Sequence, residues 1–180
     1  MSGGDFRELS VEFSSGTASA REDDDVVREF SYRLQFRDGL VEDPPQLSWQ
    51  FDRADPPGVV WTDWAVRLVS PAVKQILSAH AGPRDVIQWM PAALTDASGR
   101  EAEYWTPHFP VWHDVLHEEL TEIGSSGLPM RWVLDRSKLD GLAVFIVPRM
   151  TSHVVVRQDV ADLLSAARVG GYSEQRAPQA

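Results

Sequence analysis

The apolar segments of this chain are short, and turn residues separate them along the whole sequence. The longest strongly apolar run, LAVFIV at 142–147, is far too short to cross a bilayer. Proline pairs in EDPP (42–45) and RADPPG (53–58) mark exposed connections. The pattern mixes hairpins with a few separate helices and lacks regular β-α alternation. We therefore predict an α+β fold, with a mostly antiparallel or mixed sheet, hairpins, and two or three short amphipathic helices.

Two kinds of periodicity locate the expected elements. A helix is expected to begin at Pro71, with Ser70 as its N-cap, and another covers 158–171, stopped by Gly170 or Gly171. The turn TDASG joins two strands as a hairpin. Apolar alternation and β-branched runs predict strands at 28–36, 47–51, 64–70, 85–94, 100–105, 130–135, 142–147 and 153–157.

Length and composition favour one domain with loosely attached ends. The chain has 180 residues, 43% of them hydrophobic and seven of them tryptophan, which is enough for one sizeable core. We predict a flexible acidic lead-in over 1–25, a single α+β domain over 26–175 and a disordered tail at 176–180. The absence of cysteine and of a signal-peptide pattern agrees with a cytoplasmic location.

The chain is strongly acidic, with 27 acidic and 17 basic residues and a formal net charge of −10. Nucleic-acid binding by phosphate neutralisation requires a concentrated basic patch, and the sequence contains none. An acidic chain is better suited to a basic protein partner, whose approach it accelerates. No lysine or arginine lies between Arg100 and Arg131, so negative charge concentrates there. A solvated face that keeps the protein in solution is the simpler interpretation of the same charge.

Aromatic and acidic residues adjoin each other in this stretch. Two tryptophans flank TPHFPV, and the acidic run follows directly. Aromatic anchors beside a charged rim are typical of protein-binding hot spots. A core-filling role for the tryptophans is the alternative. The partner-binding residues that we predict are Trp105, Trp112, Asp114, Glu118, Glu119 and Glu122.

A histidine pair in VWHDVLHEE suggests a different chemistry. A helix over 111–123 would place His113 and His117 together beside an apolar seam, as in the H-E-x-x-H motif of zinc proteases. Asp114 would stand where that motif has its general base. No second motif identifies a third ligand among His80, His108, His153 and the carboxylates. We therefore expect ordinary boundary histidines, with no metal, no cofactor and no catalytic residue, and keep a metal-dependent hydrolase as the alternative.

Three segments carry a resemblance to a known family. They are LVSPAVKQILSAH, DVIQWMPAALTDASGREAEYW and WVLDRSKLDGLAVFIVPRMTSHVVVRQDVADLLSAARVGGYS. Their order is a strand entering a short helix, a Q-x-x-P hairpin with a D-x-x-G turn, a strand pair, and a closing helix with glycine. This order resembles immunity protein family eleven, a group of bacterial proteins formerly classed as a domain of unknown function. The resemblance covers about residues 59–172, and residues 1–58 do not align with it.

The resemblance implies a cytoplasmic antidote that binds one cognate toxin of a polymorphic or secreted toxin system. It carries over no catalytic residue. Together with the charge, it makes a non-enzymatic immunity protein our leading hypothesis. The partner would be a toxin that is basic at its contact surface, with no role for nucleic acid or membrane. An adaptor or chaperone for a secreted effector needs the same acidic surface and is a further alternative.

Overall fold

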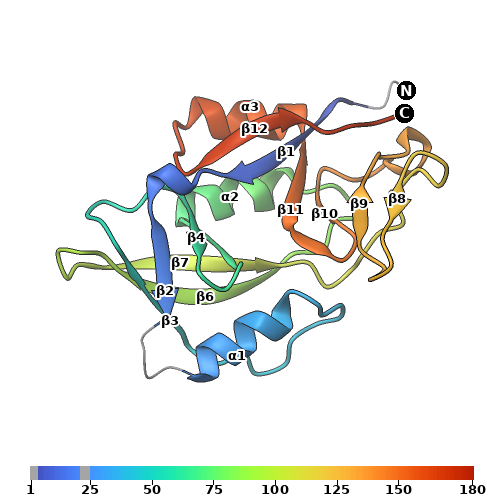
Figure 1. The fold of residues 1–180 in the computed structure, drawn as a ribbon. Helices are drawn as coiled ribbons and strands as arrows, with labels where there is room; N and C mark the ends of the chain where they lie inside the picture. Colours follow the sequence, from blue (N-terminus) through green and yellow to red (C-terminus); the bar gives the residue numbers. More distant parts are fainter. Residues whose placement is uncertain (1–3, 21–24) are drawn as a thin grey trace.

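A closed barrel and a four-stranded sheet make up the body of the molecule (Figure 1). The computed structural model describes residues 4–20 and 25–180. Within these residues, three α-helices accompany the barrel, the sheet and a separate two-stranded hairpin. The predicted α+β class, with mostly antiparallel and mixed strand pairing, is confirmed. None of the helices in the described ranges is long and apolar enough to span a bilayer.

Six strands close the barrel in the order β2-β3-β6-β7-β5-β4. Alternate residues of β6 and β7 point inward, so Met90, Leu94 and Tyr104 join Leu68 in a buried core. The predicted hairpin of β6 and β7 is confirmed, with its turn at 96–100. The strands are β2 (Thr17–Ala20), β3 (Leu47–Phe51), β4 (Val59–Thr62), β5 (Arg67–Val69), β6 (Gln88–Thr95) and β7 (Glu101–His108).

The four-stranded sheet has the order β10-β11-β1-β12 and is antiparallel throughout. β1 (Phe6–Val11) lies between β11 (Met150–Arg157) and β12 (Tyr172–Arg176). β10 (Val144–Val147) pairs with the other side of β11. The first strand of the chain is therefore a central strand whose two neighbours come from near its end.

The predicted flexible lead-in is wrong where the chain forms β1 and β2. Phe6, Glu8 and Leu9 are all buried in β1. Because Glu8 is charged, the sequence pattern does not indicate a strand with an apolar face here. Residues 1–3 and 21–24 of the predicted lead-in lie outside the described part of the chain.

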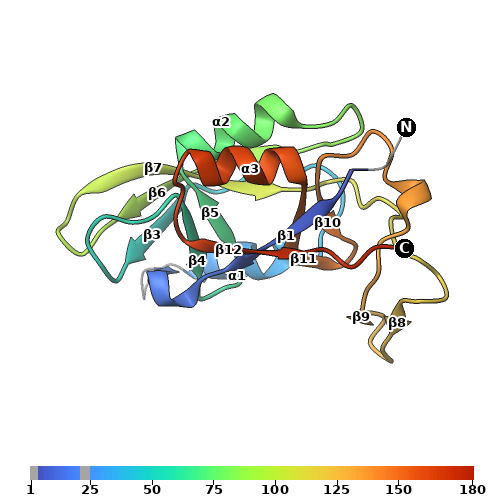
Figure 2. The ribbon, with the colours of Figure 1, turned by 90° about the horizontal axis from the view of Figure 1, so that it is seen from above.

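Helices α2 (Pro71–His80) and α3 (Gln158–Ala166) lie side by side over the junction of barrel and sheet (Figure 2). Ser70 and Pro71 occupy the predicted N-cap and first-turn positions, although the Ser70 side chain makes no capping hydrogen bond. The predicted closing helix is confirmed as α3, but it ends at Ala166, before the glycines that were expected to stop it. One buried cluster joins both helices to the two sheets: Leu9, Val69, Val73, Leu77, Ile146, Val156, Val160 and Leu164 are among its members.

Helix α1 (Asp25–Leu34) occupies most of the segment for which alternation predicts a strand, so the strand over 28–36 is wrong. The buried positions are Val27, Ser31 and Leu34, spaced by four and three residues, as a helix requires. A serine in this stripe hides the helical period. Tyr32 and Phe36, which supply the alternation, are exposed and pack edge to face. Through Val27 and Leu34, α1 packs against the barrel core.

The predicted disordered tail is also wrong, because the last residues pack into the body. Ala177 is fully buried in a third apolar cluster. The Leu134 N–H donates to the Pro178 carbonyl at 2.8 Å, and the Ala180 N–H donates to the Leu134 carbonyl at 2.9 Å. The Arg136 N–H donates to the Ala180 carbonyl at 2.9 Å. These contacts are made by backbone groups, which side-chain composition does not report.

Candidate functional site

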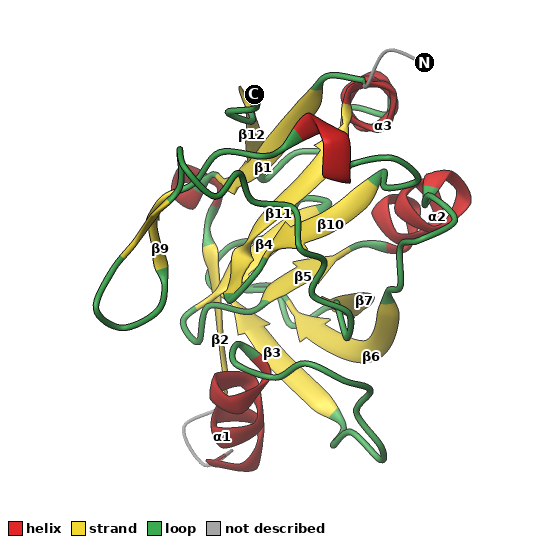
Figure 3. Cartoon of the chain, turned by 90° about the vertical axis from the view of Figure 1, so that its right-hand side faces the viewer, coloured by secondary structure: helices red, strands yellow, loops and turns green. Residues whose placement is uncertain are grey.

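A long irregular hairpin, residues 115–135, projects from one end of the molecule; we call it the hairpin arm (Figures 1 and 3). At its base, the Asp135 N–H donates to the Val115 carbonyl at 2.9 Å, and the His117 N–H donates to the Val133 carbonyl at 2.8 Å. Toward its tip, β8 (Glu122–Ile123) pairs with β9 (Pro129–Arg131). Val115 is fully buried in the third cluster, so the base is anchored while the tip extends into solvent.

Apolar side chains are exposed along the tip of the arm. Leu120 is 43% exposed, Ile123 is 57% exposed and Met130 is 76% exposed. The buried clusters contain none of these three side chains. Exposed apolar side chains gathered on one projecting element are a common feature of protein-binding surfaces. Our sequence prediction did not include these residues; the pattern IGSSGLPM, a loop between apolar residues, is the signal that could have identified them.

The four carboxylates predicted for partner binding lie on or beside the arm, and two of them form ion pairs. Asp114 is paired at the base, with its Oδ2 3.0 Å from Lys138 Nζ. Glu122 lies opposite Arg131 across β8 and β9, at 3.8 Å. Glu118 and Glu119 are exposed, and neither takes part in an ion pair with another described residue. These two side chains lie in the turn between His117 and Thr121, next to the base of the arm, and Glu118 also interacts favourably with the charge of Lys138.

The two predicted tryptophans lie away from this tip. Trp105, on β7, is half-buried against α2, and Lys74 Nζ lies 3.0 Å from the centroid of its ring. Trp112 is also half-buried and packs against the same cluster as Trp105. Figure 2 shows α2 and the pair β8–β9 on opposite sides of the molecule. The predicted residues thus fall into two groups, two core-facing tryptophans and four carboxylates of the arm.

The helix predicted over 111–123 is wrong, since residues 115–123 form the first limb of the arm. The helical geometry on which the zinc-protease interpretation of His113 and His117 depends is therefore absent. Two of the candidate third ligands are engaged elsewhere: His108 Nε2 lies 2.8 Å from the Gly39 carbonyl oxygen, and His153 bonds Glu8. Among residues 4–20 and 25–180, no group of three histidine or carboxylate side chains is placed to hold a metal ion.

Two grooves adjoin each other on the outer face of the β6–β7 hairpin. One, of about 520 Å³, is lined by Pro44, Pro91 and Glu101 among others. The second, of about 560 Å³, contains Trp105 and Lys74, and Glu103 lines both. Ser78 also lines the second groove, but among the described residues no hydrogen bond joins its hydroxyl to Lys74 or Glu103.

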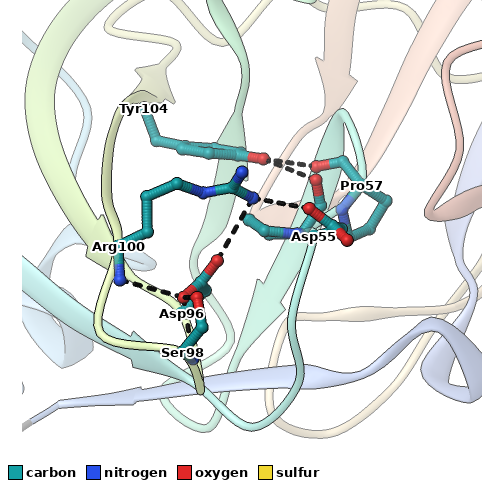
Figure 4. A network of polar contacts seen from close by, with 7 residues as sticks. Asp55, Pro57, Asp96, Ser98, Arg100 and Tyr104 are labelled. Carbon is teal, nitrogen blue, oxygen red and sulfur yellow. Dashed lines mark hydrogen bonds and ion pairs between the residues drawn. The ribbon is translucent and has the colours of Figure 1, made fainter.

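The turn of this hairpin is held by a polar network (Figure 4). Asp96 accepts hydrogen bonds from the Ser98 hydroxyl and from the backbone N–H groups of Ser98 (2.9 Å) and Arg100 (3.0 Å), which lowers the pKa of its carboxyl to about 2. Arg100 lies 2.6 Å from Asp55 and 3.2 Å from Asp96, and the Tyr104 hydroxyl donates to the Pro57 carbonyl at 2.6 Å. These contacts fix the turn to the neighbouring loop, which is a structural role.

Sequence reasoning also missed a buried polar cluster between the barrel and the sheet. The Arg67 guanidinium of β5 donates from Nη2 to the carbonyl oxygens of Leu9 and Ser152, each at 2.9 Å. Glu8 accepts hydrogen bonds from His153 and Gln175. Burial raises the pKa of the Glu8 carboxyl, but these bonds outweigh burial, and its pKa is below the ordinary value. An arginine inside the apolar run AVRLVS was the available signal.

No protein-family model matches the chain, and no curated protein matches it either.

Proposed function

We propose that this chain is a non-enzymatic immunity protein, which binds a cognate bacterial toxin and blocks it by occlusion through the tip of the hairpin arm. One observation carries the proposal: Glu118 and Glu119, which are exposed and form no ion pair with another described residue, share the projecting arm with three exposed apolar side chains. Protein interfaces combine an apolar centre with a polar rim in this way. The motif resemblance over residues 59–172 and the net charge of −10 point in the same direction.

The two kinds of exposed side chain on the arm have different tasks in this proposal. Glu118 and Glu119 attract a basic toxin surface and accelerate encounter, because long-range charge attraction acts on the association rate. Ile123 and Met130 lose contact with water in the complex and slow dissociation. The anchored base holds the tip in position, which limits the ordering cost of binding.

A growth assay on the neighbouring gene tests the function. The neighbour is expressed alone, and then together with this protein. We expect the neighbour to arrest growth and this protein to restore it, with a stoichiometric complex on purification. A neighbour that is harmless alone but is stabilised by this protein would instead indicate an adaptor or chaperone, and would refute the immunity proposal.

A charge-reversal pair tests the surface. We expect Glu118→Lys/Glu119→Lys to lower the association rate constant about tenfold at low ionic strength and to flatten its salt dependence. We expect Met130→Ser to raise the dissociation rate instead. The control is Asp38→Lys/Glu42→Lys, which makes the same charge change at two exposed positions of the loop after α1. Equal slowing by both pairs would show that only net charge matters and would remove the arm from the proposal.

A further inference from the structure

Arg67 is a buried cation whose hydrogen-bonding capacity is only partly used. The residue is 8% exposed, and Nη2 alone holds both of its bonds to carbonyl oxygens. Its Nε and Nη1 atoms, which carry three N–H groups, have no acceptor among the described residues. Burial lowers the pKa of the guanidinium to about 10, so the group remains charged at neutral pH. Unsatisfied donors on a buried charge are costly unless something accepts from them.

Glu8, the carboxylate that interacts with the charge of Arg67, does not accept a hydrogen bond from it. Glu8 contributes a favourable charge interaction to Arg67. However, its Oε1 bonds His153 and its Oε2 accepts from Gln175 at 2.7 Å. The free N–H groups of Arg67 therefore require an acceptor from another source.

A cavity of about 30 Å³ lies beside Arg67, between the C-terminal end of α1, β5, β7 and β11. Thr106 and His108 also line it. The Thr106 side chain is 1% exposed, and its Oγ1 is a second buried group without a hydrogen-bond partner among the described residues. A single water needs roughly 10–15 Å³ by the same measure. The space therefore has room for one ion of halide size or for two waters, and it is too small for a polyatomic organic anion.

We infer that this cavity is a binding site for a small inorganic anion of halide size, held by the Arg67 guanidinium and the Thr106 hydroxyl. The chemistry of the lining selects an anion because both unsatisfied groups offer hydrogens, and one of them carries a positive charge. Such an ion would tie α1 to the barrel–sheet junction, since Leu34 and Gln35 line the same cavity. This site is separate from the hairpin arm and does not depend on the proposed function.

Thermal unfolding in chloride and in gluconate at equal ionic strength tests the site, because gluconate is too large to enter. We expect the wild-type Tm to rise saturably with chloride, by roughly 3 °C at 200 mM, and not with gluconate. We expect Thr106→Val to raise the half-saturating chloride concentration roughly threefold or more. Arg67→Met should abolish the difference between the two salts.

The ³⁵Cl linewidth of the full chain provides a second readout that does not require the Arg67 variant to fold. Saturable broadening by the wild-type protein, reduced by Thr106→Val, supports the site. Identical Tm values in the two salts, with no broadening, would show that the cavity holds ordered water only and would overturn the inference. A chloride effect that is unchanged by Thr106→Val would place the ion elsewhere and would overturn it equally.

Discussion

A Cβ atom at Gly171 would lie 1.8 Å from the carbonyl oxygen of Val59, far inside any allowed contact. The residue adopts φ +93°, a conformation that favours glycine, where the chain leaves α3 and enters β12. The Gly171 carbonyl also accepts from the Glu12 N–H at 3.2 Å. This one position therefore brings the end of the chain against both β4 and the segment after β1. The sequence indicates a glycine that ends a helix, but not the carbonyl that it faces.

Replacing Gly171 by alanine, and comparing it with the same change at Gly99, should separate two contributions to the loss of stability: the steric clash of the new Cβ and the strain of the positive φ angle. We expect Gly171→Ala to lower the free energy of unfolding by about 3 kcal/mol or more, because the Val59 strand must move. Gly99→Ala is the matched control: Gly99 has φ +83°, but a Cβ there would meet nothing within 4 Å. That variant should lose only about 1–2 kcal/mol. Urea unfolding of both measures the difference, and equal losses would mean that backbone strain alone explains Gly171.

At the scale of elements, a helix or strand is predicted correctly where its buried positions are all apolar and follow the spacing of that element. The β6–β7 hairpin and helices α2 and α3 bury apolar residues at a regular spacing, and the sequence predicts them. α1 and β1 place Ser31 and Glu8 among their buried positions, and both predictions fail. The prediction of a helix over 111–123 fails for another reason. These residues pair with a second limb farther along the chain, and the pattern within one segment does not report that pairing.

The candidate site divides in the same way. The concentration of carboxylates in residues 114–122 is a property of the sequence itself, and the structure places them on or beside the arm; a role in partner binding stays a prediction. The sequence does not show which tryptophans lie beside these carboxylates, because that depends on tertiary packing. In the structure, Trp105 and Trp112 pack against the core. The loop pattern between Ile123 and Met130 suggests a hairpin, but the exposure of these two apolar side chains is seen only in the folded chain.

The turn of the β6–β7 hairpin should make stability depend on acidity. The pKa of Asp96 is about 2 in the folded chain, below the ordinary aspartate value of 3.8, so its ionised form stabilises the fold. This contribution is complete above about pH 4 and is lost as the pH falls toward 2. We expect Asp96→Asn to be less stable than wild type near neutral pH, with the gap closing between pH 4 and pH 2. Urea midpoints across that range measure it; a gap that is constant with pH would contradict the assignment.

At the scale of the whole molecule, the two ends of the chain are joined through the same sheet. β1 pairs with β12 from Arg7–Arg176 to Val11–Tyr172, and the Ala177 N–H donates to the Phe6 carbonyl at 3.0 Å. The residues that follow reach the second limb of the hairpin arm through Leu134. The end of the chain therefore supports both the central strand and the base of the candidate site.

Removal of residues 177–180 should loosen the arm without removing any of its residues. Four backbone hydrogen bonds link this segment to Phe6, Leu134 and Arg136. We expect their loss to lower the free energy of unfolding by roughly 2–4 kcal/mol. Amide hydrogen exchange should accelerate at Leu134 and Arg136, while the Val156 amide, in the sheet interior, provides the internal reference. Unchanged exchange at Leu134 would show that the arm is held by its own pairing alone.

The central position of β1 also has a consequence for how the protein is made. β1 is synthesised before both of its partners: β11 begins about 140 residues after the end of β1, and β12 begins about 160 residues after it. At roughly 5–20 residues per second, the nascent β1 waits some ten to thirty seconds with an unpaired edge. Until then, the barrel strands can close around their own core, since they lie between residues 17 and 108. The four-stranded sheet can therefore be completed only after all strands of the barrel have been synthesised.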